Sequence, residues 1–192
     1  YDTSNPFLDR FGNLAIDIPR TPSRLLYTLE PRQMSTLIEA ASNARNKAIV
    51  SLLADSGGRR NEIINIQVKD VDLERCRIRV WGKGNKEGWL IFGPGTYALI
   101  SAHLTETNPQ GNLFDLNKWG LKSMLNRLEK KTGIHCNPHA FRRGFTTELR
   151  RKGLSELDIA ELGRWSSTSM VKRYTKAYTF EDAAKRYQAI VT

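Results

Sequence analysis

The period at which apolar residues recur changes along the chain, and this change constrains the fold more than any other feature of the sequence. Before residue 67 the period is helical, with Pro31 near the first helix start and Gly57-Gly58 breaking the chain. Each helix is therefore predicted to bury one apolar stripe. The stripe residues are Met34, Leu37, Ile38 and Ala41, then Ile49, Leu52 and Leu53, then Ile63, Ile64 and Ile66.

Near residues 75–80 the period becomes two, because Cys76, Ile78 and Val80 alternate with arginines. This alternation predicts a half-buried strand with one cationic face. The residues 82–85, Gly-Lys-Gly-Asn, favour a tight turn, and residues 89–92 can form the returning strand of a hairpin. The arginines of the cationic face are Arg75, Arg77 and Arg79.

Helical patterning dominates again from about Thr96 onward. Ser155 is a good N-cap, and Leu154 and Ile159 are placed as a hydrophobic staple around it. The predicted fold class is mainly α with a small antiparallel β-sheet (α+β). A further amphipathic face is formed by Leu121, Met124, Leu125 and Leu128.

The chain carries 30 Lys and Arg against 20 Asp and Glu, a formal charge of +10 over 192 residues. Such an excess favours a polyanionic partner, nucleic acid before membrane, although charge alone does not exclude a merely soluble basic protein. Its cysteines, Cys76 and Cys136, stand sixty positions apart, which favours a reducing compartment over a disulfide framework. No apolar run approaches the roughly 20 residues of a membrane span.

Two segments in the first half of the chain carry candidate phosphate ligands. In Ser56–Glu62, Arg59 and Glu62 lie three apart on one helical face, so the carboxylate can orient the guanidinium. Taken alone, that segment is better explained by a helix C-cap followed by an ordinary surface ion pair. In Gly82–Lys86, glycines flank Lys83, which would project from a mobile turn.

A third segment, 139–143, reads His-Ala-Phe-Arg-Arg, and on a helix positions 139, 142 and 143 share a face. A basic surface helix is the simpler interpretation, and a metal site of His135, Cys136 and His139 is disfavoured because no fourth ligand with zinc-like spacing is nearby. Trp165 and Tyr174, nine positions apart, are each typical core residues when taken alone.

Taken in order, these segments resemble the tyrosine recombinase (phage integrase) family over about residues 30–178. The family pattern is an Arg with a following acid, a hairpin Lys, a His-x-x-Arg, a His or Trp, and a Tyr. Arg143 stands where a second histidine is frequent, and Arg164 is an extra residue before Trp165. The matching segments are Gly58–Glu62, Gly82–Lys86, His139–Arg142, Gly163–Ser167 and Tyr174–Lys176.

The resemblance implies DNA cleavage and rejoining through a 3′-phosphotyrosyl link, with no cofactor and no metal. Tyr174 would be the nucleophile, and Tyr178, four residues on, is the competitor. Arg59 and Arg142 would bind the phosphate, with Glu62 as a supporting residue that fixes Arg59. The remaining catalytic assignments are His139 as base or proton-path member, Lys83 as acid, and Trp165 for phosphate contact and packing.

The resemblance also implies how the chain is organised and what it binds. Residues 1–24 are predicted to be a linker from a missing N-terminal DNA-binding domain, 25–179 the catalytic domain, and 180–192 a tail helix that packs on a neighbouring subunit or on its own domain. The expected partner is double-stranded DNA, bound by a homo-oligomer (a tetramer in the synaptic complex, a monomer when isolated) in the cytoplasm, without a membrane. The disfavoured alternatives are a catalytically silent DNA-binding regulator and a type IB topoisomerase. The predicted DNA contacts are Arg60, Arg75, Arg77, Arg79, Lys86, Arg143 and Arg164.

Overall fold

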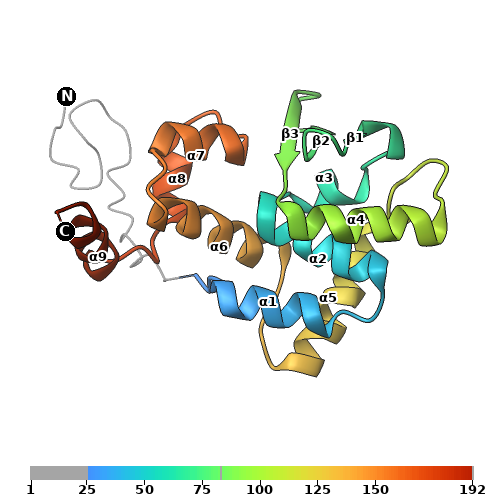
Figure 1. The fold of residues 1–192 in the computed structure, drawn as a ribbon, viewed down its shortest axis with the longest axis horizontal. Coiled ribbons are helices and arrows are strands. Elements are labelled where there is room, and N and C mark those ends of the chain that lie inside the picture. Colours follow the sequence, from blue (N-terminus) through green and yellow to red (C-terminus); the bar gives the residue numbers. More distant parts are fainter. Residues whose placement is uncertain (1–25, 83, 192) are drawn as a thin grey trace, which may run out of the picture.

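The computed structural model describes residues 26–82 and 84–191 (Figure 1). The predicted linker 1–24 and Lys83 therefore lie outside the described residues. The helices are α1 (Pro31–Ala40), α2 (Ala44–Ser56), α3 (Arg60–Ile64), a 3-10 turn η1 (Val68–Asp70), α4 (Pro94–Thr107), α5 (Lys118–Thr132), α6 (Pro138–Arg151), α7 (Glu156–Gly163), α8 (Thr168–Tyr174) and α9 (Phe180–Val191). The strands are β1 (Val71–Asp72), β2 (Arg77–Trp81) and β3 (Glu87–Ile91).

Helix α2 lies at the centre of the main core and is buried on nearly every side. Helices α1, α4 and α6 and strand β3 all pack against it. It starts at Asn43, whose side chain accepts a hydrogen bond from the Asn46 backbone, and it ends at Gly57, whose φ of 55° is left-handed. Because other elements pack around α2, the residues that follow it in the chain have a fixed position.

The strands form one antiparallel sheet in the order β1-β2-β3. The predicted alternation is confirmed in β2, where Ile78 and Val80 are buried and the alternating Arg77 and Arg79 are not. The prediction was wrong for Cys76, which has a φ of 49° and lies in the turn before β2. Strand β1 pairs with β2 through Val71 and Ile78, and sequence periodicity did not indicate it because two residues show no period.

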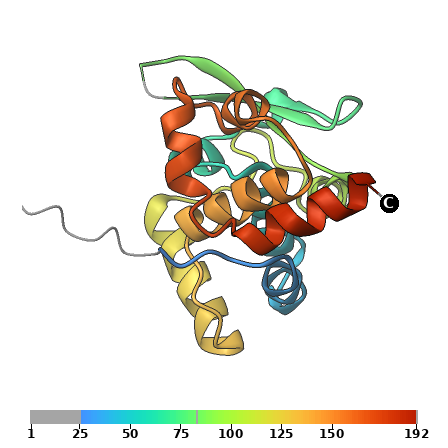
Figure 2. The same ribbon diagram turned by 90° about the vertical axis from the view of Figure 1, so that its left-hand side faces the viewer.

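A smaller second core holds α6, α7 and α8 together on one side of the molecule (Figure 1). It is built from Ile159, Ala160 and Val171, with Trp165 packed against them. The predicted N-cap is confirmed, since the Ser155 side chain accepts a hydrogen bond from the Asp158 backbone. Strand β3 lies against α7, so the sheet and the second core meet (Figure 2).

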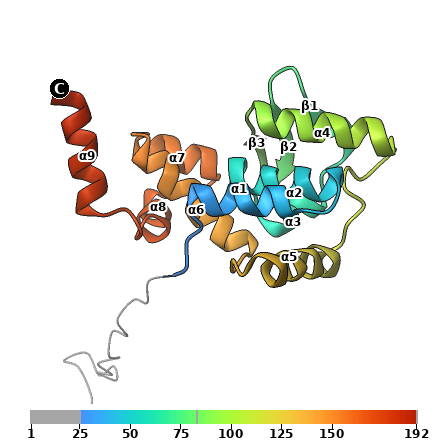
Figure 3. The same cartoon turned by 60° about the horizontal axis from the view of Figure 1, so that its bottom comes forward.

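Helix α9 extends away from the rest of the chain (Figure 3). It touches α6 through Asp182, which pairs with Arg151, while Phe180, Tyr187 and Ile190 are exposed. None of the helices in residues 26–82 and 84–191 is long and apolar enough to cross a membrane.

Gly57 offers a direct test of how tightly α2 is joined to α6. A Cβ at Gly57 would lie 2.6 Å from Phe145 Cδ1, whereas a Cβ at Gly133, which also has a positive φ, would meet nothing within 4 Å. Gly133→Ala should therefore cost only the left-handed strain, about 1–2 kcal/mol. Gly57→Ala should add about 1–3 kcal/mol for overpacking, measured by urea unfolding. Equal losses in the two variants would contradict the close α2–α6 contact.

Candidate active site

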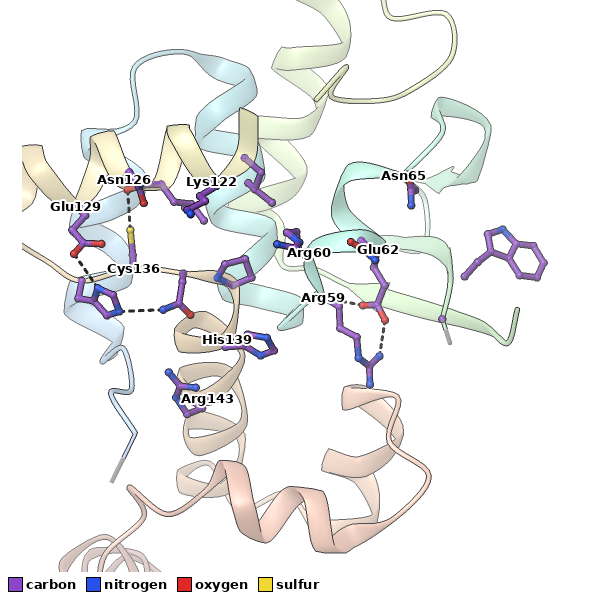
Figure 4. Close-up of a pocket in the computed structure, with 18 residues that line it drawn as sticks. Arg59, Arg60, Glu62, Asn65, Lys122, Asn126, Glu129, Cys136, His139 and Arg143 are labelled. Carbon is purple, nitrogen blue, oxygen red and sulfur yellow. Dashed lines mark hydrogen bonds and ion pairs between the residues drawn. The ribbon is translucent and has the colours of Figure 1, made fainter. Parts of the chain in front are cut away.

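Arg59 and Glu62 form a closely bonded pair at the start of α3 (Figure 4). Arg59 donates from its guanidinium to Glu62 Oε1 at 2.6 Å and from its backbone N–H to Glu62 Oε2 at 2.8 Å. Only 2% of the Glu62 side chain is exposed, against 38% for Arg59. Burial raises the pKa of Glu62, but Arg164 and the bonds from Arg59 lower it further, so its net pKa lies below the usual value. The carboxylate is therefore charged and holds one edge of an accessible guanidinium.

Arg142 is the largest fully buried side chain among the described residues. It donates to the carbonyl of Gly57 at 2.6 Å and to the carbonyl of Gly163, so it joins the ends of α2 and α7. Burial, followed by the charges of Arg59 and Arg164, lowers the pKa of Arg142 to about 9. The guanidinium remains protonated at neutral pH and places a positive charge inside the protein.

The ring of Trp165 covers Arg142, and the ring of Tyr174 lies next to it. The Arg142 guanidinium carbon lies 4.3 Å from the Trp165 ring centre and 5.9 Å from that of Tyr174, and the two rings are 5.1 Å apart. The competing Tyr178 instead lies against Arg150, whose guanidinium carbon is 5.1 Å from its ring. Spacing in the sequence therefore selected the tyrosine that the structure places next to Arg142.

His139 lies in the wall of a cavity of about 960 Å³ that Arg59, Arg60 and Arg143 also line (Figure 4). The His139 side chain is exposed at this wall, yet the surrounding protein still withdraws it partly from solvent. This partial burial lowers the pKa of His139, and so do the nearby charges, of which Arg143 contributes most. The imidazole is therefore neutral at neutral pH and able to accept a proton.

The predicted DNA-contacting residues are not equally free. Arg60 and Lys86 are exposed. Arg143 lines the cavity but also donates to the Tyr27 carbonyl at 2.6 Å. The three arginines of the predicted cationic face are paired: Arg75, in the turn before β2, and Arg77 pair with Asp72, and Arg79 pairs with Asp70.

Arg164 does not fit the prediction that it contacts DNA. Its side chain is only 11% exposed, and it pairs with Glu62 at 3.0 Å. Periodicity could not reveal this contact, because the two residues are 102 positions apart. The one signal in the sequence was that Arg164 is an extra residue before Trp165.

Sequence reasoning also missed the wall of the cavity opposite α3. It is formed by polar residues of α5 and of the segment before α6. For α5, the sequence had predicted only the apolar stripe. His135 is bound there by Glu129 at 2.9 Å and by Asn137 at 3.1 Å. Within the part of the chain that the structure describes, no group of three metal-ligating side chains occurs, so His135, Cys136 and His139 do not form the metal site considered from the sequence. The polar residues of this wall are Lys122, Asn126, Glu129, His135 and Asn137.

The fold is that of a tyrosine recombinase catalytic domain. It aligns with the crystal structure of XerA recombinase at a TM-score of 0.78 and 27% identity, over 92% of this chain and 69% of that one. The crystal structure of XerH recombinase bound to difH substrate, at 22% identity, has the same fold, with a TM-score of 0.67 over 92% of this chain and 58% of that one. The chain belongs to the phage integrase family, whose model matches residues 27–180.

Individual relatives agree with this membership. Tyrosine recombinase XerA of Saccharolobus solfataricus is 32% identical over 76% of this chain and 50% of its own length. Tyrosine recombinase XerC of Staphylococcus haemolyticus is 28% identical over 82% of this chain and 59% of its own length. The chain thus spans about half the length of the curated relatives it matches.

The electrostatics of the cavity can be tested without any substrate. Because Arg143 is the largest charge acting on His139, we expect Arg143→Ala to raise the pKa of the imidazole toward its ordinary value of 6.5. The measurement is an NMR titration of the His139 ring in both proteins. Arg150→Ala, which removes an arginine paired with Glu156, serves as the control and should leave the His139 titration unchanged. A wild-type midpoint at or above 6.5 would contradict the charge assignment.

Proposed function

We propose that this chain cleaves and rejoins double-stranded DNA at specific sites through a covalent link to Tyr174. The observation that carries the proposal is the grouping of a buried arginine, Arg142, with the rings of Trp165 and Tyr174, next to the bonded Arg59–Glu62 pair. Family membership supports it, since the relatives are named tyrosine recombinases. Structures of XerH and of the Tn1549 transposon integrase in complex with DNA support DNA as the substrate.

In this proposal the phosphate is bound by guanidinium groups. As the tyrosine oxygen attacks, phosphorus becomes five-coordinate and charge builds on its non-bridging oxygens. Arg59 is partly exposed at the cavity and presents a permanently charged planar donor, with Glu62 as its positioning residue. Arg142 is covered by the two rings in this structure, so its contact with a phosphate requires that the rings move.

Two proton transfers accompany the exchange of bonds. The Tyr174 hydroxyl loses its proton as the new bond to phosphorus forms, and neutral His139 is the proposed acceptor or proton-path member. The bond from phosphorus to the 5′ oxygen breaks, and that oxygen takes a proton for which Lys83 is the proposed donor. A 5′ hydroxyl later attacks the phosphotyrosyl link and restores a phosphodiester, so the bond energy is conserved.

Alternative functions are less well supported. A silent DNA-binding regulator should have lost at least one of the six predicted catalytic residues, yet all six are present in the sequence. A type IB topoisomerase is disfavoured by the Gly-Lys-Gly-Asn-Lys hairpin. We further propose that the protein acts in the cytoplasm as a homo-oligomer on DNA, a tetramer when synapsed, and that α9 docks on a neighbouring subunit through its exposed apolar residues.

The nucleophile can be identified by covalent trapping on a nicked DNA duplex whose short 3′ fragment diffuses away after cleavage. Without divalent metal, the wild type should form a covalent protein–DNA adduct, and Tyr174→Phe should form none. Tyr178→Phe is the matched control, because it removes the same hydroxyl four residues on and should leave the adduct intact. The measurement is denaturing gel electrophoresis of labelled DNA. An adduct formed by Tyr174→Phe, or lost in Tyr178→Phe, would contradict the assignment.

The salt dependence of DNA binding can distinguish arginines that contact phosphate from arginines that are paired with an acid of the protein. Arg60 is exposed at the cavity, whereas Arg79 donates two hydrogen bonds to Asp70, at 2.9 and 3.1 Å. Each lost phosphate contact reduces the slope of log K against log salt by about 0.9. We therefore expect Arg60→Ala to lower the slope by about that amount and Arg79→Ala to leave it unchanged, measured by fluorescence anisotropy. An equal reduction of the slope in Arg79→Ala would mean that the β2 face binds DNA as the alternation first indicated, and an unchanged slope in Arg60→Ala would mean that Arg60 does not contact a phosphate.

A further inference from the structure

Arg164 has a backbone conformation that is unfavourable for a residue with a side chain. It is the C-cap of α7, with φ 55° and ψ 48°, in the left-handed region where glycine is the usual residue. An arginine there carries a strain that a glycine would avoid. The Arg164 side chain therefore carries a cost in backbone strain, which its contacts must offset.

The guanidinium of Arg164 binds groups from three separate parts of the chain. It donates to Glu62 Oε2 at 3.0 Å, to the Leu162 carbonyl at 2.7 Å and to the Trp89 carbonyl at 3.1 Å. Burial lowers its pKa, but a guanidinium stays charged far above neutral pH, so the ion pair with Glu62 persists. Arg164 thus ties α3, the end of α7 and strand β3 to one point.

The backbone of Arg164 contacts the candidate active site as well. Its carbonyl accepts a hydrogen bond from the Arg59 guanidinium at 3.0 Å. The residue before it, Gly163, accepts from Arg142, and the residue after it, Trp165, covers Arg142. Both of the proposed phosphate-binding arginines are therefore bonded to the segment that Arg164 anchors.

Strand β3 leaves room for this side chain at Gly88. A Cβ at Gly88 would lie 2.9 Å from Arg164 Cδ, closer than real Cβ contacts allow. The Arg164 side chain therefore crosses β3 where the strand has no side chain of its own. A mobile surface arginine would not require such a gap.

We propose that Arg164 is a positioning residue that holds the Glu62 carboxylate and its own carbonyl in the geometry that orients the Arg59 guanidinium toward a phosphate. The role rests on the proposed function. Glu62 bonds Arg59 with one oxygen and Arg164 with the other, and its Oε2 also accepts the Arg59 backbone N–H. Without Arg164, the carboxylate loses one of the three hydrogen bonds that fix its orientation, and the direction of the Arg59 guanidinium is less tightly held.

The test compares variants in single-turnover cleavage of the nicked substrate by the 192-residue chain. Arg164→Gly suits the left-handed backbone and keeps the carbonyl, so it removes the side chain and leaves the backbone contact to Arg59 in place. We expect it to slow cleavage at saturating DNA about 10- to 100-fold, the range for residues that orient a ligand-binding group. The dissociation constant for DNA should change less than about 3-fold, because the buried side chain makes no phosphate contact in this proposal. Arg164→Lys, which keeps the charge but not the fork of bonds, should fall between wild type and Arg164→Gly.

Two further comparisons separate positioning from a general loss of structure. Glu62→Gln should slow cleavage, and adding Arg164→Gly to it should cost little more, because both act through one interaction. Gly88→Ala should slow the wild type by displacing the Arg164 side chain, yet have no effect in the Arg164→Gly background. Arg150→Ala, which removes another half-buried ion-paired arginine, should leave the cleavage rate unchanged.

Each result bears on the proposal. Wild-type cleavage with an unchanged rate in Arg164→Gly would overturn the positioning role and leave the proposed function standing. A rate loss matched by an equal loss of DNA affinity would mean that Arg164 contacts DNA after all. Additive losses in the double variant with Glu62→Gln would also overturn the role. If the wild type bound DNA but gave no adduct, the proposed function would fail, and the role of Arg164 with it.

Discussion

The buried guanidinium of Arg142 is the interaction on which the rest of the structure depends. It joins Gly57, at the end of the central helix α2, to Gly163, at the end of α7 in the smaller core. The last carbonyls of a helix have no partner within it and carry partial negative charge, so they are suited to receive a cation. Replacing Arg142 by an apolar residue would leave both helix ends unpaired inside the protein, at a cost of about 1–3 kcal/mol for each group.

This arrangement concentrates positive charge around a single carboxylate. Burial lowers the pKa of Arg142, and the nearby charges of Arg59 and Arg164 lower it further, whereas Glu62, the buried acid among them, favours the charged forms of Arg142 and Arg164. The excess of cations over anions is what a bound phosphate would neutralise, and the charges are in place before any ligand arrives. Partial burial keeps His139 neutral, together with the charges of Arg143, Arg142, Arg60 and Arg59, of which Arg143 contributes most. The guanidinium groups are thus cations, and the imidazole is able to accept a proton.

The sequence predicted what depends on neighbours along the chain. The helical stripes, the alternation of Ile78 and Val80, and the cap at Ser155 are local patterns that the structure contains, except that α3 ends at Ile64 and the buried Ile66 lies beyond it. The pair of Arg59 with Glu62 was also foreseeable, because three positions on a helix define one face. The strand was placed two residues too early, at Arg75 instead of Arg77, since the left-handed turn residue Cys76 leaves no mark on an alternating pattern.

Contacts between distant segments were beyond local reasoning. That Arg142 is buried and that Arg164 binds Glu62 depend on how α6, α7 and α3 meet in space, across 85 and 102 positions of sequence for the bonds to Gly57 and Glu62. A basic residue in a motif was therefore assigned to DNA when its partner was a buried acid. The resemblance to a family supplied part of this information, because it related motifs that lie far apart in the sequence and that no single periodic pattern connects.

Tryptophan at position 165 follows from the burial of Arg142. A fully buried guanidinium needs a flat, polarisable surface on the face that no carbonyl reaches, and the indole ring, 4.3 Å from the guanidinium carbon, provides it. An imidazole there would cover less of the guanidinium and, if protonated, would repel it. The indole can donate a hydrogen bond but cannot take up a proton, so proton transfer must be assigned to another residue. Of the imidazoles at the cavity, that of His135 is bonded through both ring nitrogens to Glu129 and Asn137, which supports His139 as the proposed base.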